Sequence, residues 1–323
     1  MIRLSIIVPV YNGESTIKAC IKSLLKQTEK VNIIIVNDGS TDSTESIVKE
    51  IAKKSDNCFY YYKSNSGISD TRNYGVSKVE TEYFGFLDSD DTVKEDMAEK
   101  MLNSIIKNNA DICMSNFTWV YDDSTRKEAK DINYKNKHEI LEKMFATLWN
   151  KIYRTNWYKE TNITFPSGLR YEDASVLYRL ALYMDKVCYV DESFVDYYQR
   201  TGSITHTFNI NINDMISVFE GIKDFYVSNN VFDEYKDEIE YLYIRFFLGN
   251  SYLRACRIDD KSIREETLKK GWQFLATNFP MFKNNRYLNS KGVKNIYFKN
   301  INEALYYFNV YVFRILYRIR IIK

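Results

Sequence analysis

Three carboxylates within four residues form the segment of this chain that is best suited to chemistry. Asp88, Asp90 and Asp91 follow the apolar run 83–87, which is typical of a buried strand. Several negative charges at a partly desolvated strand end are costly unless a divalent cation or a cationic ligand balances them. Carboxylate oxygens suit Mg²⁺ or Mn²⁺, and Mg²⁺ is commonly held by one or two carboxylates together with substrate phosphates. The motif therefore predicts a Mg²⁺ or Mn²⁺ site with a phosphorylated ligand; the alternative is that Asp90 or Asp91 only caps a helix over 94–107.

Strands and helices alternate in the first hundred residues, and these elements must position the motif. Strand patterns occur at 4–10, 31–36, 58–62 and 83–88, and helical patterns at 17–25, 43–52 and 70–79. Near-continuous apolar strands between amphipathic helices predict an α/β fold with a mostly parallel sheet covered on both faces. Ligands bind at the carboxyl ends of the strands in such sheets. The polar segments 11–13, 37–40 and 88–91 lie at these ends, so we expect the site there.

The later part of the chain changes character. Residues 122–137 indicate an exposed loop that is a candidate lid. Beyond it we expect helices over 138–148 and 172–183 and strands over 187–190 and 194–198. From about residue 211 the pattern is mainly helical. We therefore expect a domain boundary near 210, with a sheet domain over 1–210 and a helical C-terminal region over 211–323.

Composition favours a cytoplasmic globular protein. The five cysteines are scattered singly, which favours a reducing compartment and argues against a cysteine metal site. No basic or apolar leader precedes the first strand pattern. The net charge of +2 hides a basic end: nine Lys or Arg and one Glu between residues 281 and 323 give 9 − 1 = +8, so the rest carries about 2 − 8 = −6. Basic charge gathered at one end indicates an anionic surface as partner, and no nucleic-acid partner is expected.

The basic end also contains an apolar and aromatic segment, residues 304–323. An Arg at the centre of a membrane-spanning helix is penalised by about 2.5–3.5 kcal/mol on insertion scales. Arg314 lies in the middle of this segment with Arg318 on the same helical face, so spanning is disfavoured. A helix lying in the interface, with its Arg side chains at anionic head groups, fits better, which would place the protein at the inner face of the cell membrane. The alternative is a helix that packs into the protein's own core or against a partner subunit.

Segments between residue 2 and about residue 206 occur in the order and spacing of a known family. They read IIVPVYNGESTI, IIIVNDGSTDST, NSGISDTRNYGV, YFGFLDSDD, LWNKIYR, FPSGLRYEDASV and YYQRTGSITH. Together they resemble a family 2 glycosyltransferase with the GT-A nucleotide-sugar-binding fold, over roughly two thirds of the chain. The resemblance implies transfer of a sugar from a nucleoside diphosphate donor, most often UDP-linked, to a hydroxyl of a glycan or lipid-linked glycan, with inversion at the anomeric carbon.

The resemblance also implies which residues bind the nucleotide sugar. Tyr11 is expected to stack on a pyrimidine, Asp38 to accept the ring N–H of uracil, and Arg72 to contact the uracil or the phosphates. The other residues expected at the nucleotide sugar are Pro9, Asn12, Asp88, Ser89, Arg200 and Ser203. The alternatives are ordinary packing for Tyr11, a turn for Asp38 and a solvated helical position for Arg72.

A metal role follows from the same resemblance. Asp90 is the expected direct ligand of Mn²⁺ or Mg²⁺, which would stabilise the negative charge that develops on the departing diphosphate. Asp91 and His206 are further candidates for the metal. For Asp91 the alternative is a supporting or capping role, and for His206 it is a surface position in a loop.

The second acidic pair, Glu172 and Asp173, begins a predicted helix. By resemblance we expect Asp173 to be the base that removes the proton from the acceptor hydroxyl, with Glu172 as the second choice. The alternative is that both carboxylates only stabilise the helix through its macrodipole. Trp149 and Lys151 belong to a segment that the resemblance places on the acceptor side.

Two other functions remain alternatives at this point. The run from Leu87 to Val93 also fits the motif of haloacid-dehalogenase-type phosphatases, in which Asp88 would be the nucleophile. That motif normally follows the first strand of its domain, and the segments around Asn12 and Asp38 would be left unexplained. A non-catalytic binding module is the second alternative, and the two acidic clusters argue against it. The donor sugar, the acceptor and a homo-oligomeric state are left open.

Overall fold

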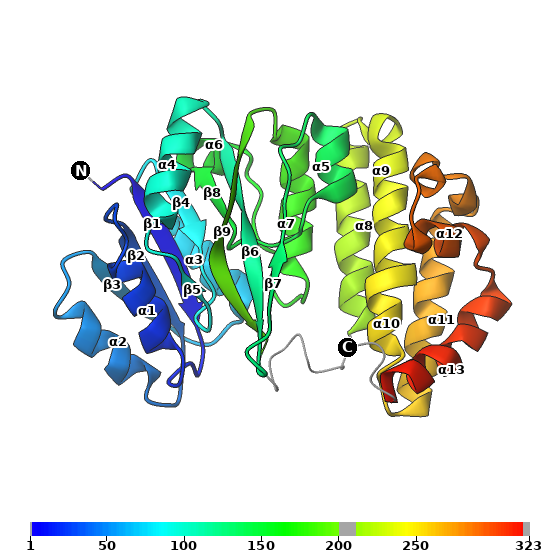
Figure 1. Ribbon diagram of the computed structural model, residues 1–323, viewed down its shortest axis with the longest axis horizontal. Helices are drawn as coiled ribbons and strands as arrows, with labels where there is room; N and C mark the ends of the chain where they lie inside the picture. The colour runs from blue at the N-terminus through cyan, green and yellow to red at the C-terminus, as the bar shows by residue number, and fades with distance from the viewer. Residues whose placement is uncertain (1, 200–210, 319–323) are drawn as a thin grey trace. The chain divides into compact units, whose positions relative to one another are not determined.

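The computed structural model describes residues 2–199 and 211–318. The chain divides into two compact units, Met1–Thr201 and Gly202–Lys323. The described part of the first unit contains a sheet with flanking helices, and that of the second is helical (Figure 1). This confirms the predicted α/β fold with a helical C-terminal region. The predicted boundary near residue 210 adjoins the segment that the structure does not describe, and it stays a prediction.

Four parallel strands form the first half of the sheet, in the order β3-β2-β1-β4. Their bounds are β1 (Leu4–Val10), β2 (Asn32–Asp38), β3 (Cys58–Lys63) and β4 (Tyr83–Phe86). The helices that connect them are α1 (Ile17–Leu25), α2 (Thr44–Ala52) and α3 (Ile68–Ser77). Every residue of β1 is buried, because its apolar side chains are covered on both faces of the sheet. The carboxyl ends of these strands therefore open at one common edge.

The second half of the sheet is mixed, in the order β4-β8-β6-β9-β5, with β7 paired to β6. The strands are β5 (Thr92–Val93), β6 (Ile112–Tyr121), β7 (Arg126–Ala129), β8 (Lys151–Arg154) and β9 (Val187–Gln199). β8 runs antiparallel to β4 and β6, whereas β6 and β9 are parallel. The helices of this half are α4 (Met97–Lys107), α5 (Lys137–Lys143), α6 (Thr155–Glu160) and α7 (Glu172–Leu180).

Three local predictions differ from the observed elements. The predicted loop 122–137 contains β7, which pairs with β6 in a hairpin, so the loop prediction is wrong for residues 126–129. The predicted helix 138–148 ends at Lys143, because residues 144–150 leave the helix before β8. The two predicted strands over 187–198 are one strand, whose register against β6 shifts around Asn116.

Helix α3 approaches the sheet closely, and this closeness fixes the position of the residues that it carries. A Cβ atom at Gly75 would lie 2.4 Å from Cγ2 of Ile7 in β1, which is nearer than any real side chain could come. Only glycine allows this packing without a shift of the helix. The preceding turn of α3, which contains Arg72, is thereby held against the carboxyl edge of the sheet.

The second unit is built on aromatic packing between helices. These helices are α8 (Ile212–Ser228), α9 (Phe232–Ile244), α10 (Ser251–Ala255), α11 (Lys261–Asn278), α12 (Val293–Asn300) and α13 (Glu303–Arg318), with a π-helical turn over Arg245–Asn250. The Tyr243 ring packs against the rings of Phe219 and Phe274, with a centroid distance of 5.2 Å to each. Within residues 2–199 and 211–318, every helix is too short or too polar to cross a bilayer.

Candidate active site

The buried guanidinium of Arg72 joins the two acidic motifs. Its Nη1 donates hydrogen bonds to Glu172 Oε1 and Asp173 Oδ1, each at 2.6 Å, and its Nη2 donates to Asp88 Oδ1 at 3.0 Å. Arg72 lies on α3, Asp88 follows β4, and the other two carboxylates begin α7. Carboxylates from segments more than eighty positions apart in the chain therefore meet at one point.

Negative charge is in excess at this point. Three carboxylates around one guanidinium leave a formal charge of 1 − 3 = −2. Burial raises the pKa of the Asp173 carboxyl well above its usual range; Arg72 opposes this shift, and the charges of Glu172 and Asp88 add to it. Burial disfavours the charged form of Arg72, but the carboxylates outweigh it, so the pKa of the guanidinium is raised. A cation brought to this cluster would relieve the repulsion between its carboxylates.

The loop before α7 is attached to α3 by a set of polar contacts. Asn73 donates to the carbonyl oxygen of Phe165 at 2.9 Å and accepts from its backbone N–H at 3.0 Å. The Phe165 ring lies 5.7 Å from the Arg72 guanidinium, and Ser167 donates to Asp70. Tyr171, the residue before α7, has a left-handed backbone with φ 64°, which is uncommon for a non-glycine residue. The entry of α7, and with it Asp173, is thus held by several contacts to α3.

The three carboxylates of the segment after β4 differ in burial and in their contacts. Asp88 and Asp90 are half-buried, while Asp91 is fully buried. The Asp91 carboxylate accepts the backbone N–H of Tyr198 at 2.9 Å, which ties this segment to β9. This favours the supporting role for Asp91. The alternative helix-cap role for Asp90 or Asp91 is wrong, because α4 begins at Met97 after Asp96.

A divalent cation fits the chemistry of this segment. Among residues 2–199 and 211–318, no three His, Cys, Asp or Glu side chains are grouped so that they could hold a metal ion by themselves. Asp88 and Asp90 offer hard oxygen donors in a cluster with surplus negative charge, and Mg²⁺ is commonly bound by one or two carboxylates plus substrate phosphates. The candidate ligand His206 and the candidate phosphate contacts Arg200 and Ser203 lie outside the described residues.

Two loops form the expected nucleoside end of the site, after β1 and β2. Tyr11 is 54% exposed at the end of β1, and Pro9 is buried within that strand. Asn12 has a left-handed backbone with φ 50°; its backbone N–H donates to Ser40 Oγ at 2.9 Å and its side-chain oxygen accepts from the Thr41 N–H at 2.8 Å. Asn12 therefore connects the two loops and leaves the Tyr11 ring accessible above them.

Asp38, at the end of β2, organises the loop before α3. Its carboxylate accepts from Lys63 Nζ at 2.5 Å and from the backbone N–H groups of Ser66 and Gly67 at 3.0 and 2.9 Å. Asp38 is therefore more than a turn residue, and its expected bond to uracil stays a prediction. The Lys63 contact was missed from the sequence, where this lysine only ends an apolar run.

Trp149 and Lys151 face inward. The Trp149 ring packs against Phe117 and Tyr197, with centroids 4.6 and 4.8 Å away. Lys151 is 1% exposed, and its Nζ donates to the carbonyl oxygens of Phe145 and Thr147 and to Asn150 Oδ1. Burial lowers the pKa of Lys151 to about 8. Trp149 thus anchors the loop 144–150 on β6 and β9, and Lys151 holds the same loop by hydrogen bonds. Their expected place on the acceptor side stays a prediction.

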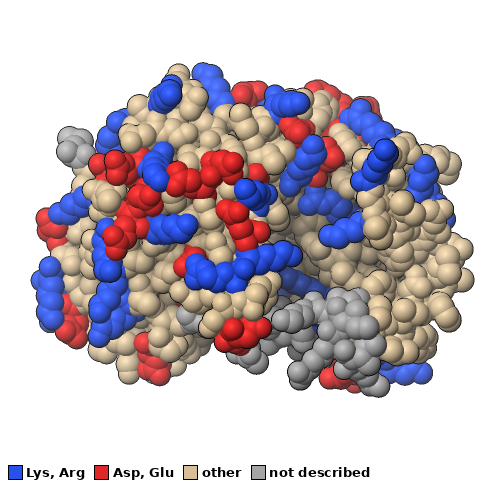
Figure 2. Space-filling model, in the orientation of Figure 1, with Lys and Arg blue, Asp and Glu red and all other residues tan. Residues whose placement is uncertain are grey.

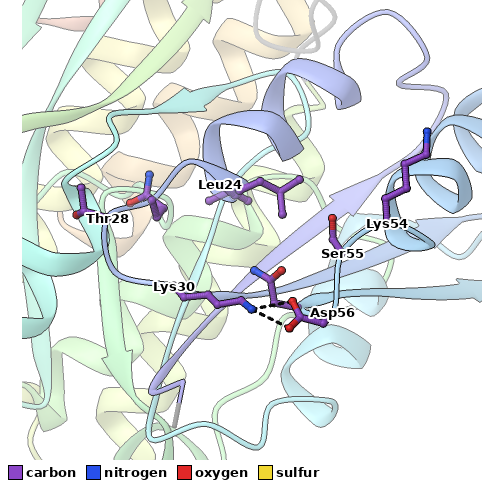
Figure 3. Close-up of a pocket in the computed structure, with 9 residues that line it drawn as sticks. Leu24, Thr28, Lys30, Lys54, Ser55 and Asp56 are labelled. Carbon is purple, nitrogen blue, oxygen red and sulfur yellow. Dashed lines mark hydrogen bonds and ion pairs between the residues drawn. The ribbon is translucent and has the colours of Figure 1, made fainter.

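A hollow of about 350 Å³ lies at the opposite edge of the sheet (Figure 3). It is lined by residues of the segments 24–30 and 54–57, which precede β2 and β3. Lys30 and Asp56 form an exposed ion pair across it, with Nζ–Oδ distances of 2.7 and 2.9 Å. Ligands of such sheets bind at the carboxyl ends of the strands, so this hollow is not the candidate active site.

A family model matches about half of this chain and ends before Glu172 and Asp173. The family model described as glycosyl transferase family 2 matches residues 5–168, which is 164 of the 323 residues and includes β1 to β4 with Arg72, Asp88 and Asp90. Glycosyltransferase GlyA of Streptococcus pneumoniae serotype 4 is 31% identical over 220 residues, which is 63% of this chain and 31% of GlyA. Glycosyltransferase GlyG of the same organism is 26% identical over 277 residues, 74% of this chain and 89% of GlyG. This chain thus spans about a third of the first of these relatives and most of the second.

A solved structure is similar in fold over most of this chain. Residues 1–349 of TarS from S. aureus, crystallised in complex with UDP-GlcNAc, match 98% of this chain and 92% of that chain, with a TM-score of 0.71 and 21% identity. The likeness confirms the GT-A-like α/β fold followed by a helical region. The family match does not favour the phosphatase alternative, because it covers the segments around Asn12 and Asp38 that this alternative leaves unexplained, and it does not favour a non-catalytic binding module either. The chain is therefore a member of glycosyltransferase family 2.

Proposed function

We propose that this glycosyltransferase moves a sugar from a nucleoside diphosphate donor, most simply a UDP-sugar, to a hydroxyl of a glycan or lipid-linked glycan, with inversion. The observation that carries the proposal is the contact of Arg72 with both Asp88 and Asp173. It places the acidic segment expected at the donor beside the carboxylate expected at the acceptor. The TarS complexes with UDP-GlcNAc and UDP support a UDP-linked donor for this fold.

Proton transfer is assigned to Asp173. The acceptor oxygen forms a bond to the anomeric carbon, the bond from that carbon to the diphosphate oxygen breaks, and its electron pair leaves with the diphosphate. The acceptor proton passes to a carboxylate oxygen of Asp173, whose raised pKa increases its affinity for that proton. Glu172 is the second choice, because adjacent helical residues point about 100° apart and only one of the pair can face the substrate.

Metal binding is assigned to Asp90, with Asp88 close to it. Both carboxylates sit at the carboxyl edge of the sheet, and Asp88 is oriented by Arg72. Mn²⁺ or Mg²⁺ bound there would neutralise charge on the leaving diphosphate. The same proposal places the enzyme in the cytoplasm at the inner face of the cell membrane, where a lipid-linked acceptor is available.

The direct test is release of UDP from a panel of UDP-sugars, with chelator and with added Mn²⁺ or Mg²⁺. We expect UDP release with one donor, and its loss in chelator. Asp173→Asn should retain donor binding and lose transfer by about 10²–10⁴-fold, because it removes the base. Asp90→Ala should abolish metal-dependent turnover.

Asp56→Asn is the matched control, since it changes an exposed carboxylate at the opposite edge of the sheet. It should behave as the unmodified protein. Release of inorganic phosphate in place of UDP, or full transfer by Asp173→Asn, would contradict the proposal. Transfer that is lost only in Glu172→Gln would make Glu172 the base.

A further inference from the structure

Helix α13 is fixed on its own unit by one face. Tyr306 and Val310 are 1% and 5% exposed. The Tyr306 ring lies 4.5 Å from that of Tyr252 and 5.1 Å from that of Trp272, and the Tyr252 hydroxyl donates to the Tyr306 carbonyl oxygen at 2.7 Å. The alternative in which this helix packs into the protein's own core is therefore correct for this face.

The opposite face of α13 presents a row of large apolar side chains. Their exposed fractions are 43% for Leu305, 62% for Phe308, 64% for Tyr311, 41% for Val312 and 59% for Ile315. At 100° per residue these five positions fall within an arc of about 120°, so they form one stripe along the helix, here called the α13 stripe. Contiguous exposed apolar surface of this kind marks an interaction site more often than a single exposed residue does.

The stripe itself carries no charge, which corrects one expectation. Arg314 was expected to meet anionic head groups, but its Nη1 donates to the carbonyl oxygens of Cys256 and Ile258 at 2.9 and 2.8 Å. Its side chain is 19% exposed. Arg314 therefore satisfies carbonyl oxygens that follow α10 and is unsuited to lipid contact.

Positive charge surrounds the stripe along the chain. Residues 290–318 contain five Lys or Arg and one Glu, a net charge of 5 − 1 = +4. Lys291, Lys294 and Lys299 are exposed on and beside α12. Figure 2 shows mostly uncharged surface where Figure 1 draws α13, at the lower right of the view. The arrangement is an apolar stripe bordered by cations.

We propose that the α13 stripe lies in the interfacial layer of a membrane rich in anionic phospholipid, with Phe308, Tyr311 and Ile315 inserted among the acyl chains and the lysines of α12 at the head groups. Interfacial helices combine an apolar face with basic flanks in this way. A second copy of this chain is disfavoured as the occupant, because two surfaces of the same positive charge would be brought together. At 1.5 Å per residue, the 16 residues of α13 extend about 24 Å, a length suited to lying along a bilayer surface.

The inference rests on the proposed function only for the purpose of membrane binding, which would bring the enzyme to a lipid-linked acceptor. Lipid binding is measured without turnover, so the two proposals can fail separately.

The test is co-sedimentation of the full chain with vesicles of phosphatidylcholine alone and of phosphatidylcholine mixed with phosphatidylglycerol. We expect binding to the anionic vesicles only. The double variant Phe308→Glu with Ile315→Glu should lower the bound fraction by about tenfold or more, because it removes two apolar anchors and adds two negative charges. Lys291→Gln with Lys294→Gln should weaken binding to the anionic vesicles while leaving the stripe intact.

The matched control is Val227→Glu with Ile263→Glu, which places the same charges on exposed apolar positions of α8 and α11 in the same unit. It should bind vesicles as the unmodified protein does. Circular dichroism melts establish that each variant is folded, and Phe308→Ser replaces the double variant if that one is not. Equal binding to both vesicle types would overturn the proposal, and so would an equal loss of binding in the control variant. The proposal would also fail if the protein does not bind vesicles and instead forms a dimer that the stripe variants dissociate.

Discussion

Arg72 and Lys151 are both buried cations of the first unit, but their surroundings differ. Arg72 is hydrogen-bonded to three carboxylates, whereas the oxygen atoms hydrogen-bonded to Lys151 Nζ belong to neutral groups. The pKa of Arg72 is raised because the carboxylates outweigh burial. Burial lowers the pKa of Lys151 to about 8, although Asp131 and Asp173 oppose the shift.

The difference separates a candidate ligand site from a structural clamp. Around Arg72 the carboxylates repel one another, and under the proposed function a cation with its phosphates would relieve that repulsion; such imbalance is common where function requires it. Around Lys151 the three donors of the ammonium group are matched by three oxygens of the loop 144–150, so the contacts are satisfied without any ligand. A buried cation alone therefore does not indicate function; the charge balance around it does.

The largest effect is expected when the Arg72 guanidinium is removed from the acidic cluster. Arg72→Met leaves Asp88, Glu172 and Asp173 to repel one another, and Asp173 loses the contact that orients it. We expect turnover to fall by about 10³-fold or more. The free energy of unfolding should fall by about 2–3 kcal/mol, less than for a fully buried pair because these carboxylates are 13–28% exposed. Transfer assays and urea unfolding measure the two losses.

Lys26→Met is the control for a surface pair, since Lys26 and its partner Glu95 are 67% and 64% exposed. Its unfolding free energy should change by less than about 0.5 kcal/mol. Arg72→Lys should be intermediate, because one ammonium group cannot bridge three carboxylates as the planar guanidinium does. Unchanged turnover in Arg72→Met would remove the argument for a functional cluster.

A smaller effect, which depends on pH, is expected on the free energy of unfolding when Lys151 is replaced. Its folded pKa of about 8 lies below the ordinary value of 10.5, so the unfolded chain binds more protons between these values. The stability of the unmodified protein relative to Lys151→Met should therefore rise with pH across this window, by about 2 kcal/mol between pH 7 and pH 9.5. Urea unfolding of both proteins at each pH measures the difference, from which titrating groups that do not interact with Lys151 cancel.

The comparison with an exposed lysine makes this test specific. Lys26→Met is measured in the same way as the surface control, because its side chain is 67% exposed. A stability difference for Lys151→Met that stays constant between the two pH values would mean that burial does not lower the pKa of Lys151, and the clamp interpretation would then fail.

The parallel half of the sheet was predictable because its signals are local. Apolar runs such as residues 4–10 bury both faces of their strands, and the helices between them repeat at helical spacing. The mixed half was not: β6 contains polar Ser115 and Asn116, and its burial depends on the long pairing with β9. β7 is exposed and forms a strand through its hairpin with β6, which no local preference of residues 126–129 indicates.

The sequence named residues that the structure brings together, but it did not indicate their contacts. Asp88, Glu172 and Asp173 were named from motifs, but the sequence could not indicate that Arg72 would bridge them, because that contact depends on how closely α3 packs on β1 through Gly75. The expected place of Arg72 near the donor stays a prediction; in the structure both of its Nη atoms donate to carboxylates. Asn73 was missed, although it stands next to Arg72, because its partner is a backbone group of Phe165.

The smallest predicted effect tests whether the charge of Glu172 contributes to the raised pKa of Asp173, the proposed base. Asp173 must be ionised to accept a proton, so the transfer rate should rise with pH through its raised pKa. Glu172 contributes to that shift, and Glu172→Gln should move the acidic limb of the pH profile to lower pH by up to about one unit, or about 1.4 kcal/mol. Asp56→Asn, far along the sheet, should leave the profile in place. If the acidic limb stays at the same pH in Glu172→Gln, the charge of Glu172 does not raise the pKa of Asp173. The excess negative charge around Arg72 would then act on ligand binding and not on the pKa of the base.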